Sequence, residues 1–74
     1  MTYGETAVGL DFNPSGDDDV KKVKELFAEI IDLCDVLRDD AKTGEKKRLF
    51  SVAITEAQGA QMWAVKAITF RDRA

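Results

Sequence analysis

Phe12-Asn13-Pro14-Ser15-Gly16 places an aromatic ring and an amide directly before the expected start of a helix. The backbone N–H groups at a helix N-terminus lack partners within the helix and are a common binding site for phosphate. In such a site Phe12 can stack on a base, and Asn13 can hydrogen-bond the edge of that base. Lys24, two turns into the helix, can contact a phosphate. A simpler interpretation stays open, in which the segment only staples and caps the helix and Lys24 is exposed.

A second polar group, Arg48, Ser51 and Thr55, occurs near the start of the next expected helix. Their spacing of three and then four residues puts all three side chains on one helix face. That face can present a guanidinium and two hydroxyls to a phosphate or a base. The alternative is an ordinary surface, with Arg48 in solvent and two tolerated small polar residues.

Residues for catalysis are scarce, because the chain has no histidine and a single cysteine, Cys34, on the expected core seam. Glu25, Glu29 and Asp32 share a helix face and resemble half of the magnesium site of helical nucleotide pyrophosphohydrolases. Such a site needs a second carboxylate pair from a facing helix, which here offers only Glu56. We therefore predict no catalytic residue, no metal site, no cofactor and no enzymatic activity, with a pyrophosphohydrolase as the weakest alternative.

The elements that position these residues are predicted to form an all-α fold, an antiparallel two-helix hairpin preceded by an extended arm. Helices are expected over residues 17–40 and 45–71, joined by a link at residues 42–44. This divides the chain into an N-terminal arm (1–16) and a helical hairpin domain (17–74). Ser15 is the expected N-cap of the first helix. Gly44 is the expected residue of positive φ in the link.

Both helices carry more apolar surface than a hairpin can bury. The first has a seam at Val20, Val23, Phe27, Ile30, Cys34 and Leu37, and the second at Leu49, Ala53, Ala60, Trp63, Ala67 and Phe70. The run from Met62 to Ile68 is apolar on nearly every side of the helix. A chain of 74 residues buries little surface alone and, with one cysteine and no histidine, lacks a disulfide or metal to compensate. We therefore expect an obligate oligomer.

Charge is divided between the two helices. Residues 17–40 carry nine acidic and four basic side chains, and residues 41–74 carry seven basic and three acidic ones. This complementarity favours an antiparallel hairpin and leaves room for local cationic pockets. The net charge of −3 argues against binding DNA or RNA polymers. The absence of a long apolar run or a basic leader predicts a cytoplasmic protein without a membrane partner.

Three segments together resemble a known family. They are Phe12-Asn13-Pro14-Ser15-Gly16 with Val20-Lys21-Lys22-Val23-Lys24, then Arg48-x-x-Ser51-x-Ala53-x-Thr55, and Ala60-x-Met62-Trp63-Ala64-Val65-Lys66-Ala67. In combination they are similar to the hairpin domain of phage anti-CBASS sponges, which are related to a group of anti-Thoeris sponges. The resemblance covers about residues 11–70.

The resemblance implies a homohexamer that binds cyclic di- and trinucleotide immune signals, such as cyclic GMP–AMP, in the host bacterial cytoplasm without cleaving them. By position, Phe12 would stack on a purine, Asn13 would contact the same ligand and Lys24 would meet a phosphate. Arg48 and Ser51 would lie near a pocket for cyclic trinucleotides. The alternative is a small helical interaction module, a phage regulator or antitoxin-like protein that buries its Trp63 face on a partner.

Overall fold

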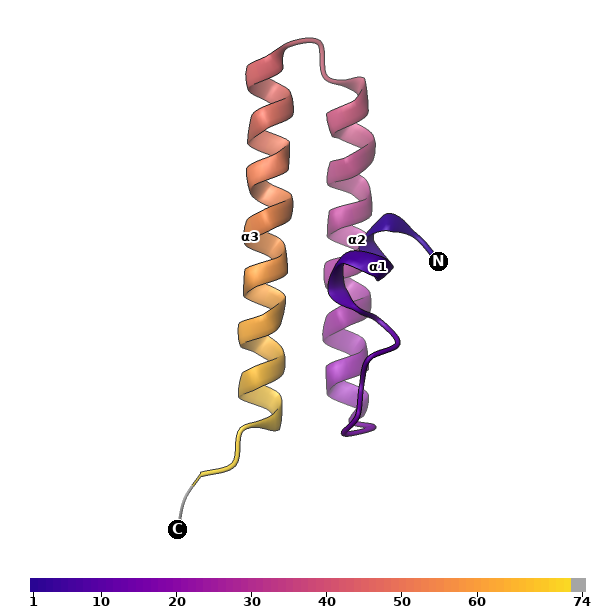
Figure 1. Cartoon of the computed structure of the whole chain (residues 1–74), viewed down its shortest axis with the longest axis vertical. Helices are drawn as coiled ribbons and strands as arrows, with labels where there is room; N and C mark the ends of the chain where they lie inside the picture. Colours follow the sequence, from indigo (N-terminus) through magenta and orange to yellow (C-terminus); the bar gives the residue numbers. More distant parts are fainter. Residues whose placement is uncertain (73–74) are drawn as a thin grey trace.

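Three helices make up the computed structural model, which describes residues 1–72: α1 (Tyr3–Val8), α2 (Asp18–Asp40) and α3 (Gly44–Thr69). The long helices α2 and α3 run antiparallel, and α1 lies against α2 near its middle (Figure 1). The molecule measures 52 × 25 × 13 Å. The predicted all-α hairpin is confirmed. Residues 73–74, the last two of the predicted hairpin domain, lie outside the described residues.

The start of α2 is capped by Asp17, and the prediction of Ser15 as N-cap is wrong. The Asp17 carboxylate accepts from the backbone N–H groups of Asp19 (2.7 Å) and Val20 (3.2 Å). Ser15 lies two residues earlier, where its hydroxyl accepts from the N–H of Asp17 and donates to the Asn13 side chain. A carboxylate in the capping position satisfies two free N–H groups at once and suits the positive end of the helix.

The link between α2 and α3 consists of residues 41–43, one residue earlier than the predicted 42–44. Thr43 caps α3 by accepting from the N–H of Lys46 (3.2 Å), and helical geometry begins at Gly44. The φ of Gly44 is not positive, so the prediction of a left-handed residue there is wrong. At its other end α3 stops at Thr69, two residues before the predicted Arg71.

The N-terminal arm contains a helix, so the prediction that it is extended is wrong. Thr2 and Glu5 form a capping box at the start of α1, and Gly9 ends the helix with a φ of 63°. A helix of six residues is not stable alone and needs packing. Here the N–H of Gly4 donates to the Asp32 carboxylate on α2 over 2.6 Å.

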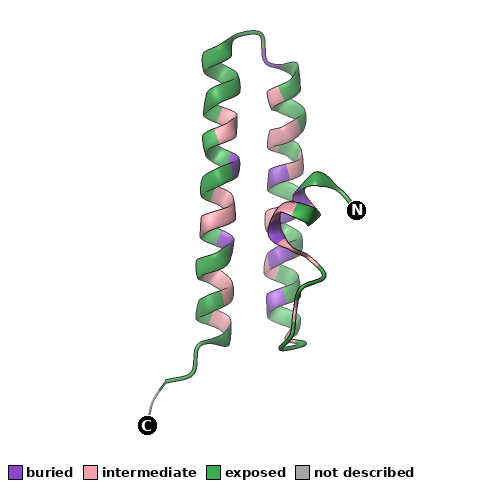
Figure 2. Ribbon diagram, in the orientation of Figure 1, coloured by how far each residue is buried: buried purple, intermediate pink, exposed green. Residues whose placement is uncertain are grey.

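The buried core is small and is shared by all three helices. It consists of Val8 from α1, Ala28 and Ile31 from α2, and Ile54 from α3, with Ile31 wholly excluded from solvent. Most of the outer surface of both long helices is exposed (Figure 2). The two long helices thus form a single layer, and α1 completes the core by packing on it.

The predicted seam of α3 is displaced by rotation of the helix, and the predicted seam of α2 is confirmed in part. On α2, Val20 is buried and Val23, Phe27 and Cys34 are half-buried, as predicted. Ile30 and Leu37 are exposed, because α1 packs on the neighbouring stripe that contains Ala28 and Ile31. On α3 the whole predicted seam is exposed or, for Phe70, lies beyond the helix, with Trp63 70% accessible. The buried stripe of α3 runs instead through two other residues, Ile54 and Gln61.

Within residues 1–72, no helix is both long enough and apolar enough to cross a membrane.

Candidate functional site

A cleft of about 250 Å³ lies where the arm meets the start of α2 and the end of α3. It is lined by Phe12, Asn13, Pro14, Ser15, Val20, Lys24, Val65 and Thr69. The fold therefore brings together three of the predicted ligand-binding residues, Phe12, Asn13 and Lys24.

The aromatic ring is presented by a tight turn that follows α1. The positive φ of Gly9 lets the chain reverse, and the N–H of Phe12 donates back to the Gly9 carbonyl over 2.9 Å. Phe12 then follows the turn outside any helix, with 74% of its surface accessible. An aromatic side chain this exposed at the edge of a cleft offers an open face for stacking.

Lys24 is buried rather than exposed, with only 5% of its surface accessible. Its ammonium donates to the carbonyl oxygens of Gly9 (2.9 Å) and Phe12, and lies 5.6 Å from the centre of the Phe12 ring. An ammonium has three donor hydrogens, so one N–H remains. Lys24 thus lines the cleft while it is already bound to the arm.

Asn13 belongs to a second closed turn. Its amide nitrogen donates to the Asp17 carbonyl (3.0 Å), its amide oxygen accepts from Ser15 (2.9 Å), and its own carbonyl accepts from the Gly16 N–H. The Asn13 amide has two donor hydrogens, so one is left to contact a ligand. The 9–12 turn and the 13–16 turn therefore follow each other directly, with Phe12 and Asn13 where they join.

The far wall of the cleft comes from α3, through Val65 and Thr69. Sequence reasoning did not identify these residues as part of the site. They lie four and eight residues after Gln61 and so continue along nearly the same face of the helix, but no sequence signal marks that face, because the burial of Gln61 is seen only in the structure.

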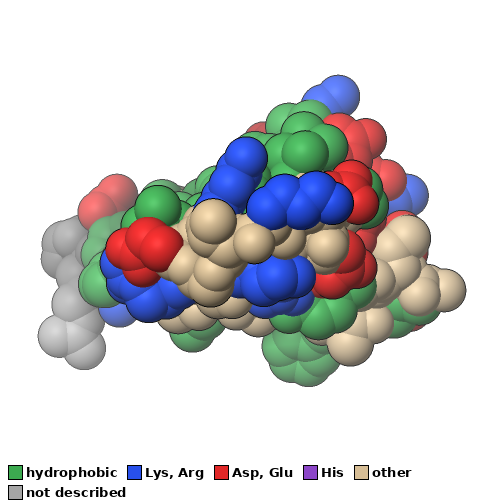
Figure 3. Space-filling model, turned by 90° about the horizontal axis from the view of Figure 1, so that it is seen from above, with side chains coloured by type: hydrophobic (Ala, Val, Ile, Leu, Met, Phe, Trp, Pro, Cys, Tyr) green, Lys and Arg blue, Asp and Glu red, His purple; other side chains and the backbone are tan. Residues whose placement is uncertain are grey.

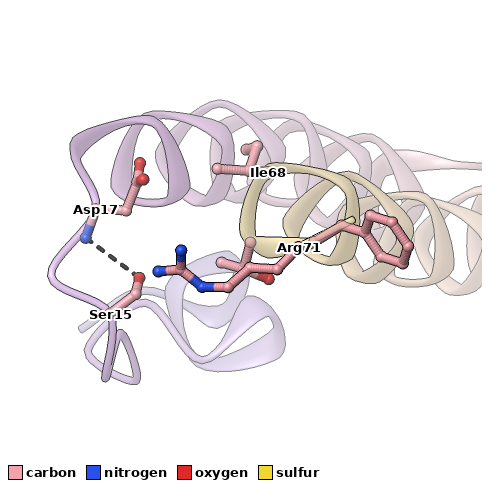
Figure 4. Close-up of a pocket in the computed structure, with 6 residues that line it drawn as sticks. Ser15, Asp17, Ile68 and Arg71 are labelled. Carbon is pink, nitrogen blue, oxygen red and sulfur yellow. Dashed lines mark hydrogen bonds between the residues drawn. The ribbon is translucent and has the colours of Figure 1, made fainter. Parts of the chain in front are cut away.

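A second cleft of about 440 Å³ adjoins the first and shares Ser15 and Thr69 with it. Arg71 extends across it from the end of α3 toward Ser15 and Asp17 (Figure 4). The two clefts differ in character, since Lys24 is the one charged side chain that lines the first, whereas both Asp17 and Arg71 line the second. Sequence reasoning also missed Arg71, because only the folded structure brings this residue beside the start of α2.

Arg48, Ser51 and Thr55 lie on the other half of α3. Arg48 pairs with Glu45 through two contacts, Nε to Oε1 at 2.6 Å and Nη2 to Oε2 at 2.9 Å. This hydrogen bonding raises the pKa of Arg48 and lowers the pKa of Glu45. Ser51 is half-buried, whereas Arg48 and Thr55 are exposed. About 20 Å of helix separates Ser51 from Val65. Within one chain, the stripe of Arg48, Ser51 and Thr55 is therefore not part of the cleft at Phe12.

Arg38 connects all three helices and was not predicted. Its guanidinium donates to Asp35 (2.8 Å) and to the Ser51 hydroxyl on α3 (3.0 Å), and lies 5.8 Å from the ring of Tyr3. The hydrogen bond to Asp35, followed by the contact with Tyr3, raises the pKa of Arg38. The Ser51 hydroxyl oxygen is therefore already engaged within the chain.

Seen from the α2–α3 link, the end of the molecule shows lysine and arginine side chains among acidic and apolar ones (Figure 3). Lys42, Lys46 and Lys47 are exposed at this end. In the part of the chain that the structure describes, no three His, Cys, Asp or Glu side chains are grouped to hold a metal ion.

Comparison with known families assigns this architecture. The family model described as "Acb2/Tad1, hairpin domain" matches residues 5–69. The chain belongs to the Acb2/Tad1 hairpin-domain family. This is the anti-CBASS and anti-Thoeris sponge family, so the predicted resemblance is confirmed. Comparisons with curated proteins and with solved structures found no match.

The Acb2/Tad1 family is known for binding cyclic nucleotide signals, and its hairpin is a binding domain rather than a catalytic one. The match begins at Glu5 within α1 and ends at Thr69, the last residue of α3. It therefore includes most of α1, both long helices and both groups of predicted ligand-binding residues.

Proposed function

We propose that this Acb2/Tad1-type hairpin is a phage anti-defence sponge that sequesters cyclic di- and trinucleotide immune signals of the CBASS type without cleaving them. One observation carries the proposal beyond the family: the exposed Phe12 ring stands at a cleft that also contains Asn13 and Lys24. An aromatic ring, an amide and a cation are the groups that a base and its phosphate require.

The base is proposed to stack on the open face of Phe12. Every base has a π-face, so stacking contributes affinity with little dependence on its identity. The remaining N–H of Asn13 would then hydrogen-bond the base edge. Val20 and Val65 supply apolar contact at the floor of the cleft.

The phosphate is proposed to meet the remaining N–H of Lys24. Lys24 is buried and its assigned partners are neutral carbonyls and a ring, so an approaching phosphate would add charge compensation. This local cation matters because the protein as a whole carries a net charge of −3.

Self-association is proposed to complete the sites. Large apolar side chains are exposed on both long helices, among them Leu26, Ile30 and Leu33 on α2 and Met62 and Trp63 on α3. Contact between copies would bury this surface. A two-fold interface would also repeat one set of ligand contacts, which suits a cyclic dinucleotide with two phosphates. The homohexamer expected from the resemblance stays our proposal for the assembly.

The stripe of Arg48, Ser51 and Thr55 is proposed as the site for cyclic trinucleotides. Arg48 would exchange its contact with Glu45 for a phosphate, and the exposed Thr55 would add a hydroxyl. Ser51 would accept from Arg38 while its own hydroxyl proton contacts the ligand.

Isothermal titration with 3′,3′-cyclic GMP–AMP, followed by chromatography of ligand recovered after denaturation, tests the proposal. Tight binding with intact ligand recovered is the expected result. Magnesium-dependent turnover would overturn the sponge in favour of a nucleotide hydrolase. If cyclic GMP–AMP, cyclic trinucleotides and cyclic ADP-ribose isomers all fail to bind, the proposal is wrong. The protein-interaction module would then be the better hypothesis.

A further inference from the structure

The environment of Lys24 is unusual for a lysine, because the side chain is buried without an acidic partner. Within the described part of the chain, no carboxylate oxygen lies within 4 Å of its nitrogen. A buried charge is costly unless hydrogen bonds compensate it. Here the compensation comes from the arm, through the carbonyls of Gly9 and Phe12 and the face of the Phe12 ring.

The two carbonyls that Lys24 contacts are the first and last of one turn. The same turn is closed by the hydrogen bond from the N–H of Phe12 to Gly9, whose own N–H donates to Thr6 at the end of α1. The Gly9 carbonyl thus accepts from Phe12 and from Lys24 together. A single ammonium therefore fixes both ends of the turn to α2.

From this geometry we infer that Lys24 is a positioning residue, which holds the 9–12 turn on α2 so that the Phe12 ring stands over the cleft before any ligand arrives. The consequence for ligand affinity rests on the function proposed above. Holding the ring in place reduces the conformational entropy that is lost on binding. Lys24 then acts on the ligand mainly through Phe12, and its direct contact with a phosphate is the smaller part of its effect.

A double-mutant cycle separates these two roles. Lys24→Met keeps the length of the side chain and removes its charge, and Phe12→Ala removes the ring. We expect Lys24→Met to weaken 3′,3′-cyclic GMP–AMP binding about tenfold or more in the parent protein, but less than about threefold in the Phe12→Ala background. Equal effects in both backgrounds would mean that Lys24 acts on the phosphate alone, and would overturn the inference.

Two further variants serve as controls in the same binding measurements. Lys22→Met removes an exposed lysine of the same helix and should leave affinity within about twofold, because exposed charges contribute little. Lys24→Arg keeps a cation with several donors and should recover part of the affinity that Lys24→Met loses. No recovery with Lys24→Arg, or an equal loss with Lys22→Met, would count against the inference.

Amide hydrogen exchange in the ligand-free protein tests the inference even if the proposed function fails. In Lys24→Met, exchange at the Phe12 N–H should rise about tenfold or more while the centres of α2 and α3 keep their protection. If that variant does not fold, the ammonium of ¹⁵N-labelled wild-type Lys24 is observed instead. It should exchange with water more slowly than the ammonium of Lys22. Unchanged exchange at Phe12, or equal rates for the two lysines, would overturn the inference.

Discussion

Gly4 of α1 lies so close to Ala28 of α2 that a Cβ atom at position 4 would overlap the Ala28 carbonyl oxygen. The same Cβ would stand 2.8 Å from a carboxylate oxygen of Asp32, which is closer than real Cβ contacts allow. Both obstructing groups are fixed, since one is helical backbone and the other accepts the Gly4 N–H. The absence of a side chain at this position therefore lets α1 cover the core.

Gly4→Ala should destabilise the protein by about 1–3 kcal/mol, the usual cost of overpacking. Urea denaturation followed by circular dichroism measures the change. Gly44→Ala is the matched control, because nothing lies within 4 Å of a Cβ at that exposed position. It should cost no stability. Equal stabilities of the two variants would show that α1 does not dock through Gly4.

The Glu45–Arg48 pair predicts how the start of α3 responds to pH. Arg48 lowers the pKa of Glu45 in the folded protein, so the carboxylate stabilises the helix above its unfolded-state pKa. That contribution should be lost as the pH falls through the folded-state pKa. An NMR titration of the Glu45 carboxyl carbon measures the midpoint. It should rise toward the ordinary value in Arg48→Gln, and the same midpoint in both proteins would contradict the pairing.

Trp63→Glu should reduce the molar mass of the assembly measured by light scattering. Trp63 is 70% accessible in the single chain, so the substitution removes little packing within it, but it places a charge in the proposed contact between copies. Phe12→Ala is the control, because it removes an equally exposed aromatic ring from the arm. A wild-type protein that stays monomeric at high concentration would contradict this prediction.

Phe12→Ala should weaken the binding of 3′,3′-cyclic GMP–AMP by about 1–3 kcal/mol, which is a loss of affinity of roughly 5- to 150-fold. This is the measured range for base–aromatic stacking. Titration calorimetry of folded, ligand-free protein gives the value. Phe12→Tyr retains the ring and should bind within about threefold of the parent. Loss of affinity with tyrosine equal to that with alanine would mean that stacking does not explain the role of Phe12.

The two long helices were predictable because their signals are local. Both predicted helices begin within one residue of the observed start, and the first ends as predicted at Asp40. The first turn of α2 carries acidic side chains, which suit the positive end of a helix. The short α1 was missed although Thr2 and Glu5 have the spacing of a capping box, since six residues form a helix only when a neighbour covers them.

The rotation of α3 was not predictable from spacing. On α3, the stripe through Trp63 and the stripe through Ile54 and Gln61 repeat at nearly the same period. Apolar periodicity favours the more hydrophobic one, yet Trp63 is exposed and Gln61 is buried. Apolar residues that the single chain leaves exposed repeat along the helix just as core residues do. A helix with two apolar faces therefore gives an ambiguous prediction of which face is buried.

The sequence by itself determined the all-α hairpin, the family and the residues whose chemistry suits a nucleotide, because caps, periodicity and motifs are properties of neighbouring residues. Only the tertiary structure decided that Lys24 is buried against the arm, that Val65 and Thr69 complete the cleft, and that Ser51 accepts from Arg38. These relationships join residues from 12 to 57 positions apart, the latter being Phe12 and Thr69. Which of them meet depends on how the helices turn toward one another, and that is set by the packing of all three helices around their shared core.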